Sequence, residues 1–339
     1  MITMRLAACL VAITVAACGS PPPVTTTYEP FEPASYQSAR APLEFYSKVR
    51  SLGSASGFGR SSFGTFDVDF AGAPDTRCTP RATPAAETIA SAFLIGDACK
   101  QVLKLVERHP YGTGSGTTFL GEAIHKEVVT GIQAGAIADD DVALDVASER
   151  VKKSMLRYFY ESVVDGTLRR SPRGWDQAFA SWGNAMDGQG AFGLSLLAQG
   201  RDKSLKTTFE KDIFAMLLNG RRILGQRGLT GDDSLKAGGS TELDKLVDDI
   251  DATLQLLFAH YGGGEFVAWQ TEVSDRPAKY VEGSLIVRAI ADAVKAKNPT
   301  QHAALMAALD KQTGAFSEAD AQTIVRVLET TYGIQIVAE

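Results

Sequence analysis

The amino-acid sequence predicts an all-α protein, a helical bundle or a pair of packed bundles, preceded by an irregular N-terminal arm. Through most of the chain after residue 84, apolar residues recur at the three- and four-residue spacing of amphipathic helices, and glycine clusters separate the segments. Alternation typical of strands is almost absent, with IQIV at 334–337 the one short candidate. A chain of 339 residues, 45% of them hydrophobic, can bury one large core or two modest ones.

The first seventeen residues predict a signal peptide that ends at a lipid-attachment site. Arg5 precedes a mainly apolar run, Leu6 to Ala17, which is shorter than the roughly 20 residues of a membrane-spanning helix and suits a signal peptide. The run ends in VAAC, which resembles the lipobox of bacterial lipoproteins. The resemblance implies that Cys18 carries lipid and anchors the chain to the outer membrane of a Gram-negative bacterium, facing the periplasm or the surface. An ordinary cleaved signal with an incidental cysteine is the alternative.

Two irregular segments are expected between the anchor and the helices. Residues 18–42 are rich in Pro, Ser and Thr and predict an extended tether. Residues 43–83 predict an irregular Gly/Ser-rich arm, whose phenylalanines should lie against a helical domain that covers 84–339. These phenylalanines are Phe58, Phe63, Phe66 and Phe70.

The cysteines are consistent with export. Cys9 leaves with the signal peptide and Cys18 takes lipid, so Cys78 and Cys99 remain as a pair in an oxidising compartment. A disulfide between them would close a loop of about 20 residues, staple the arm to the first long helix and stabilise the fold by roughly 3 kcal/mol. Two free thiols are the alternative.

The helical segments follow one another from Pro84 onward. Three aspartates at 139–141 favour a helix N-terminus, and Ser317 and Asp320 form the start of a capping box that opens a helix ending at Gly333. Breaks are expected at the glycine clusters 112–116, 188–190, 228–239 and 262–264. The predicted helices cover about 85–108, 117–137, 142–164, 174–186, 203–225, 243–261, 277–297, 299–312 and 317–332.

An aromatic stripe lies on the helix predicted at 174–186. Trp175, Phe179 and Trp182 are spaced four and three residues apart, so they share one face. A stripe of this kind is more often core than a binding surface, although it can also serve a partner. Asp176 lies on the adjacent face, near the helix start, where a carboxylate also interacts favourably with the helix dipole.

The segment WDQAFASWG, 175–183, resembles one found in imelysin-like helical lipoproteins of bacterial envelopes. The flanking stretches KKSMLRYFYESVVDG and TTFEKDIFAMLLNGRRIL resemble the neighbouring helices of that family, so the likeness covers about 85–225. It implies an all-helical periplasmic or surface lipoprotein, in a family whose members are linked to iron uptake or called peptidases. The family signature GxHxxE is not kept, because His125 in GEAIHKEVV is followed by Glu127.

A metal site for a divalent ion or iron is the second hypothesis. Glu122 and His125 have the Glu-x-x-His spacing of di-iron bundles, although it occurs once here, and Asp176 is the best candidate for a third ligand. A surface hydrogen bond between Glu122 and His125 is the alternative. His260 and Glu265, beside the glycines at 262–264, are further candidates for a cleft.

The charge and the absent motifs exclude several classes of function. A net charge of −6 argues against nucleic acid, and GxSxG and HExxH are absent. The sequence therefore favours an envelope-anchored binding or assembly module without catalysis, attached to the membrane by lipid and serving a protein partner in the envelope. The alternatives are an imelysin-like metal-binding protein and, with least support, a peptidase-like hydrolase.

Overall fold

The computed structural model describes residues 26–53, 57–67, 74–85, 87–105, 120–186, 188 and 190–338. The predicted all-α class is confirmed, because these residues form helices joined by turns, without strands. The signal peptide, Cys18, Phe70 and the glycine cluster 112–116 lie outside the described residues. None of the described helices has the length and apolarity needed to span a membrane.

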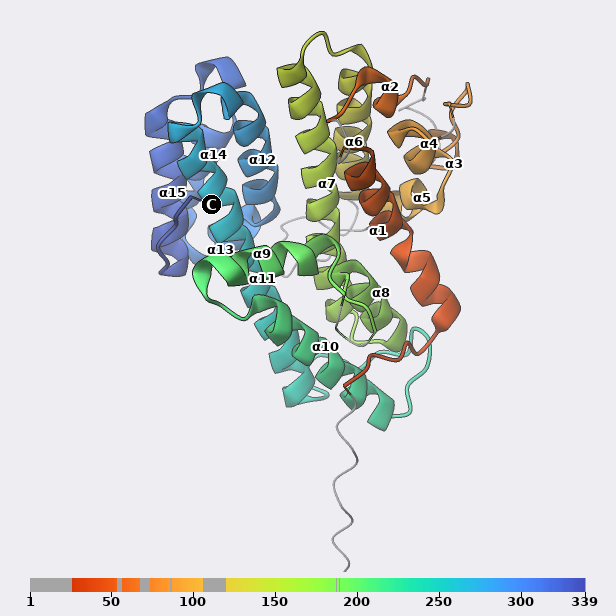
Figure 1. Ribbon diagram of the computed structural model, residues 1–339. Coiled ribbons are helices and arrows are strands. Elements are labelled where there is room, and N and C mark those ends of the chain that lie inside the picture. Colours follow the sequence, from red (N-terminus) through yellow and green to blue (C-terminus); the bar gives the residue numbers. More distant parts are fainter. Residues whose placement is uncertain are drawn as a thin grey trace, which may run out of the picture.

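The helices form two packed groups (Figure 1). In the first, α6 and α7 form a long hairpin covered by α1, α4, α5 and α8; in the second, α11 and α12 pack with α13 to α15. Helices α9 and α10 connect the groups, and α7 packs directly against α11 and α12. The bounds are α1 (Pro33–Gly53), α2 (Arg60–Phe63), α3 (Pro74–Arg77), α4 (Ile89–Leu94), α5 (Asp97–Leu103), α6 (Leu120–Ile137), α7 (Asp141–Leu168), α8 (Pro172–Trp182), α9 (Gly193–Leu205), α10 (Phe209–Gln226), α11 (Thr241–Thr271), α12 (Arg276–Ala289), α13 (Ala291–Lys297), α14 (Pro299–Leu309) and α15 (Glu318–Tyr332).

The extended tether predicted for residues 18–42 is wrong from Pro33 onward, where the chain is helical. Helix α1 begins at Pro33, inside the segment expected to be extended, and continues into the segment expected to be irregular. Proline is favoured in the first turn of a helix, and Tyr36 and Leu43 are buried on the inner face of α1. The composition predicted a linker because Pro, Ser and Thr are common in extended segments, but the same residues are also common where helices start.

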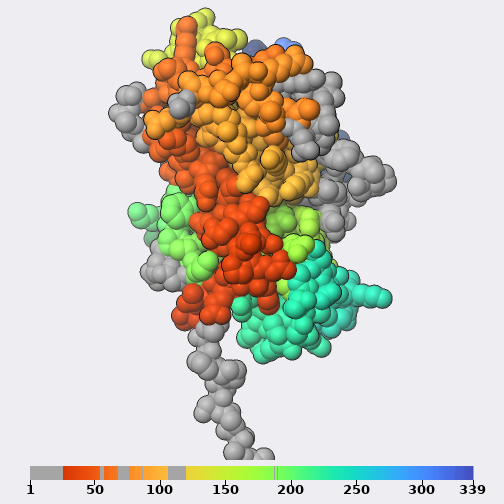
Figure 2. Space-filling model, turned by 90° about the vertical axis from the view of Figure 1, so that its right-hand side faces the viewer, coloured from red at the N-terminus to blue at the C-terminus, as the bar shows by residue number. Residues whose placement is uncertain are grey.

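The described residues of the arm after α1 lie against the helical body, as expected. Figure 2 shows the red and orange segments, the described residues between 26 and 105, on the outside of the middle and upper part of one face of the molecule. Phe63 is fully buried on Gly135 of α6, while Phe58 and Phe66 are partly buried against the core. A disulfide joins Cys78, just after α3, to Cys99 in α5, with the Cα atoms 5.6 Å apart. The predicted disulfide is therefore present, and it fastens the arm.

Three predicted helices are divided. The segment 85–108 forms α4 and α5, separated at Gly96, and 277–297 forms α12 and α13. The first residues of the segment 203–225 are the end of α9, a helix that the sequence did not predict. Helix α10 starts at Phe209. The carboxylate of Asp202 accepts hydrogen bonds from the backbone N–H groups of Phe209 and Glu210, so it caps α10 from the preceding helix.

The glycines at 262–264 lie inside α11 rather than between helices. A Cβ atom at Gly262 would lie 2.7 Å from the Val287 side chain, and one at Gly263 would lie 2.5 Å from Ile336. These glycines therefore let α12 and the C-terminal segment approach α11 closely. IQIV is not a strand; it places Ile336 in this contact.

The aromatic stripe is core. Trp175, Phe179 and Trp182 have no exposed surface. The indole Nε1 of Trp175 donates to the Leu217 carbonyl of α10 at 2.7 Å, and its ring lies where a Cβ atom at Gly220 would stand. The stripe therefore joins α8 to its neighbours and presents no surface to a partner.

Candidate ligand-binding pocket

The three predicted metal ligands do not meet. The carboxylate of Asp176 is fully buried and accepts hydrogen bonds from the Tyr28 hydroxyl at 3.0 Å and from the backbone N–H groups of Phe31 and Glu32 at 3.1 and 2.9 Å. Burial raises the pKa of Asp176, and these donors oppose the rise. Asp176 therefore holds the segment that leads into α1.

Glu122 and His125 have other neighbours. Glu122 forms an ion pair with Arg77 at 2.9 Å, and His125 is buried beside the Phe93 ring. Burial and the nearby Arg77 lower the pKa of His125 to about 4. In the described part of the chain, the group of metal-capable side chains is His125 with Cys78 and Cys99, without Glu122 or Asp176.

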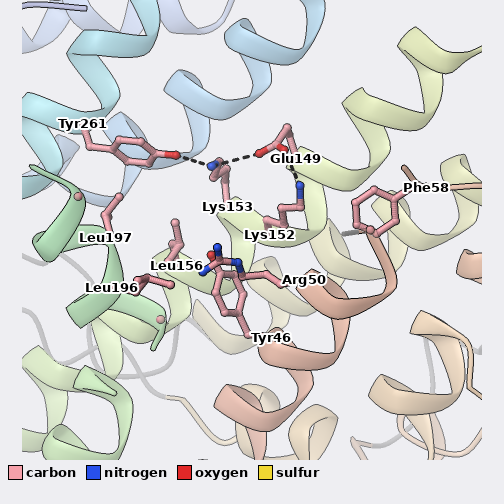
Figure 3. A pocket seen from close by; sticks show the side chains of 13 residues that line it. Tyr46, Arg50, Phe58, Glu149, Lys152, Lys153, Leu156, Leu196, Leu197 and Tyr261 are labelled. Carbon is pink, nitrogen blue, oxygen red and sulfur yellow. Dashed lines mark hydrogen bonds and ion pairs between the residues drawn. The ribbon is translucent and has the colours of Figure 1, made fainter. Parts of the chain in front are cut away.

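A different site lies where the two helix groups meet. It is a pocket of about 440 Å³ between α1, α7, α9 and α11 (Figure 3). Tyr46, Phe58 and Tyr261 supply aromatic surface, and three leucines supply the apolar wall. The lining residues are Tyr46, Arg50, Gly53, Phe58, Glu149, Lys152, Lys153, Leu156, Gly193, Leu196, Leu197, Gly200 and Tyr261.

The floor of the pocket is a buried ionic cluster centred on Lys153. Its Nζ lies 3.1 Å from Glu149 of the preceding turn and also contacts the Tyr261 hydroxyl and the Glu282 carboxylate. The Tyr261 hydroxyl donates to the same Glu282 carboxylate. The cluster thus joins α7 to α11 and α12, and fixes the two groups of helices relative to each other.

The cluster keeps its members in defined protonation states. Burial alone would raise the pKa of Glu149, but Lys153 and Lys152 outweigh it and lower the pKa to about 2. Burial alone would lower the pKa of Lys153, but Tyr261, Glu149 and Glu282 hold it well above its usual range. Burial also raises the pKa of Tyr261 well above its usual range. Glu149 is therefore ionised, Lys153 charged and Tyr261 neutral at physiological pH.

A second layer of charge lies behind the floor. Glu265 is buried in α11, 2.8 Å from the Nζ of Lys279 and 3.8 Å from the guanidinium of Arg201. Burial and the Glu282 carboxylate raise the pKa of Glu265 to about 7. The sequence pointed to Glu265 as a cleft residue, and the structure places it behind the floor instead of in the lining.

The rim of the pocket is cationic. Arg50, at the end of α1, is exposed, and Lys152 lies 5.0 Å above the Phe58 ring while pairing with Glu149 at 2.8 Å. Figure 3 shows Arg50 beside Tyr46 and Lys152 directed toward Glu149 and Phe58. With Lys153, three cations therefore face one carboxylate in the lining.

Sequence reasoning missed this pocket. One signal was present: Glu149, Lys152 and Lys153 interrupt an apolar helix and, at three- and four-residue spacing, share one face. The remaining lining comes from α1, α9, α11 and Phe58 in the segment after α1, and the sequence does not reveal that they converge.

No known protein family, curated protein or solved structure matches this chain.

Proposed function

We propose that the protein is an envelope-anchored binding module whose pocket takes an anionic small molecule with an apolar body. One observation carries this proposal: three cations and one carboxylate line a pocket in a chain of net charge −6. Glu149 and Glu282 balance two of these cations, so the rim and the floor together carry one excess positive charge, which attracts an anion.

The composition of the lining supports a ligand with two chemically different ends. Arg50 and Lys152 at the rim suit a carboxylate, sulfonate or phosphate group, with arginine able to bind it through two hydrogen bonds. Leu196, Leu197 and Tyr46 suit an apolar or aromatic body. Small-molecule sites commonly combine apolar walls with a few placed polar groups.

The protonation states support binding rather than catalysis. General acid–base groups work best with a pKa near the working pH. Glu149 is held far below neutrality, and Lys153 and Tyr261 are held far above it. Glu265, whose pKa is about 7, does not line the pocket, so these groups support a binding site over the hydrolase alternative.

The proposal keeps the envelope location expected from the sequence. With lipid on Cys18, the ten residues to Tyr28 would reach at most about 35 Å, so the body would stay near the outer membrane. A protein partner in the envelope remains part of the proposal. The turn between α6 and α7 is the candidate contact surface, because α6 ends there at Ile137, which is 79% exposed; in Figure 1 this turn lies at the opposite end of the molecule from the start of α1.

Two fluorescent probes test the pocket. Anilinonaphthalene sulfonate is an anionic aromatic dye, and N-phenylnaphthylamine is a neutral relative. We expect Arg50→Gln with Lys152→Gln to weaken binding of the anionic dye about tenfold or more, a loss of about 1.4 kcal/mol, and to leave the neutral dye unaffected.

Arg222→Gln is the control, because Arg222 is an exposed cation on α10 that pairs with Glu242 outside the pocket. It should leave the affinity for both dyes unchanged. An equal loss for both dyes in the double variant, or none for either, would overturn the proposal.

A further inference from the structure

The disulfide has a third potential metal ligand beside it. The two sulfurs and one ring nitrogen of His125 all lie within 4.8 Å of one another. The three side chains come from separate places in the fold: Cys78 follows α3, Cys99 is in α5 and His125 is in α6. All three are at least 96% buried, so the fold presents these donor atoms to one another in a closed space.

The separations suit a zinc ion once the sulfur–sulfur bond is open. Zinc binds thiolate sulfur at about 2.3 Å and imidazole nitrogen at about 2.0 Å, which places tetrahedral ligand atoms about 3.5–3.8 Å apart. The nitrogen is already within 4.8 Å of both sulfurs, so the main change is separation of the two sulfurs. Two thiolates and one imidazole are a ligand set that zinc uses with water as its fourth ligand.

Charge balance favours a divalent ion in this place. Two thiolates and one neutral imidazole around Zn²⁺ carry no net charge, whereas a lone buried charge is costly. Arg77, next to Cys78, and Glu122, three residues before His125, already neutralise each other at 2.9 Å. Both can therefore keep their pairing when the ion binds.

We propose that Cys78, Cys99 and His125 form a zinc site in the reduced protein, which the Cys78–Cys99 disulfide closes. Two equivalents of a thiol reductant convert the disulfide to two cysteine thiols and are themselves oxidised to a disulfide. Zn²⁺ then binds both sulfurs and displaces their two protons to solvent. The site is independent of the anion pocket, with which it shares no residue.

Metal counting tests the site. The full chain carrying Cys9→Ser and Cys18→Ser, which leaves Cys78 and Cys99 as the sole thiols, is unfolded, reduced with a phosphine and refolded with Zn²⁺; a second sample is refolded oxidised. Bound zinc is measured by elemental analysis after gel filtration, and affinity by competition with a chromophoric chelator. We expect one zinc per chain in the reduced sample and none in the oxidised sample.

Variants identify the ligands. His125→Ala should weaken zinc binding at least tenfold, and further Cys78→Ser with Cys99→Ser should abolish it while circular dichroism confirms the helical fold. His302→Ala, on α14, is the control and should bind like the parent. Zinc absent from the reduced parent, present equally in the oxidised sample, or unaffected by His125→Ala would overturn the proposal.

Discussion

Tyr28 lies flat on Phe179, with ring centroids 3.7 Å apart and ring planes 4° from parallel. The Tyr28 hydroxyl donates to Asp176, which lies one turn before Phe179 on α8. A residue close to the start of the described chain is thus fixed to the centre of the aromatic stripe on α8.

The first prediction concerns this contact. Tyr28→Ala should lower the free energy of unfolding by roughly 3–5 kcal/mol, because it removes a fully buried ring. Tyr28→Phe should cost about 1 kcal/mol, since it loses the hydrogen bond but keeps the stack. Urea unfolding followed by circular dichroism measures both. If the two variants lost equal stability, the stacked ring would contribute little.

The two tryptophans of α8, and Gly220, which packs against Trp175, give a second prediction. Trp175→Ala or Trp182→Ala should destabilise by roughly 3–5 kcal/mol. Gly220→Ala should destabilise by about 1–3 kcal/mol, because the new methyl group would lie 1.9 Å from the Trp175 ring. Thermal and urea unfolding measure these losses.

Gly225→Ala on the same helix is the matched control. Its methyl group would meet only Phe31, at an ordinary 3.7 Å, so the better helix propensity of alanine should leave the fold as stable or up to about 1 kcal/mol more stable. Equal destabilisation by both alanines would contradict the close packing at Gly220.

The third prediction tests the ionic floor. Lys153→Met leaves Glu149 and Glu282 buried without their shared cation, and should cost roughly 3–5 kcal/mol. Combining it with Glu282→Gln should restore part of that loss, which a double-mutant cycle in urea measures. Lys152→Met, at the rim, should cost under about 1 kcal/mol. A loss as large at the rim as in the floor would show that burial does not govern these pairs.

The fourth prediction is a pH dependence. Glu149 has its pKa lowered from 4.5 to about 2 in the folded state, so its contribution is complete above about pH 5 and is lost as the pH falls toward 2. The shift corresponds to roughly 3 kcal/mol. Relative to Glu149→Gln, the parent should therefore lose about this much stability between pH 5 and pH 2, measured by urea unfolding across the range. Parallel pH profiles would contradict the assignment.

Local signals in the sequence predicted those parts of the fold that local chemistry controls. Ser317 caps α15 and Gly333 ends it in a left-handed conformation, as expected from the capping box and the glycine. The aspartates at 139–141 place the start of α7, where Asp140 is the cap.

The features that the sequence did not predict depend on contacts between residues far apart in the chain. The start of α1 is held by Asp176, 144 residues later than Glu32, and the glycines of α11 stay helical because α12 and Ile336 occupy the space beside them. The pocket needs α1, α7, α9 and α11 to converge, and no spacing within one segment reports that. Helical spacing pointed to Glu122 and His125 as metal ligands, whereas the buried group at His125 combines side chains from α5, α6 and the turn after α3.

Helix α1 connects two features at opposite ends. The Asp176 carboxylate binds the backbone just before its first turn, and its last turns supply Tyr46 and Arg50 to the pocket, about 21 and 27 Å further along the helix. A mechanical pull on the chain before Tyr28 would therefore act first on α8, through Tyr28 and Asp176, and would reach α1 and its wall of the pocket once these contacts break. Pro42 lies between the two ends of α1 and removes one backbone hydrogen bond, so the helix would bend there first.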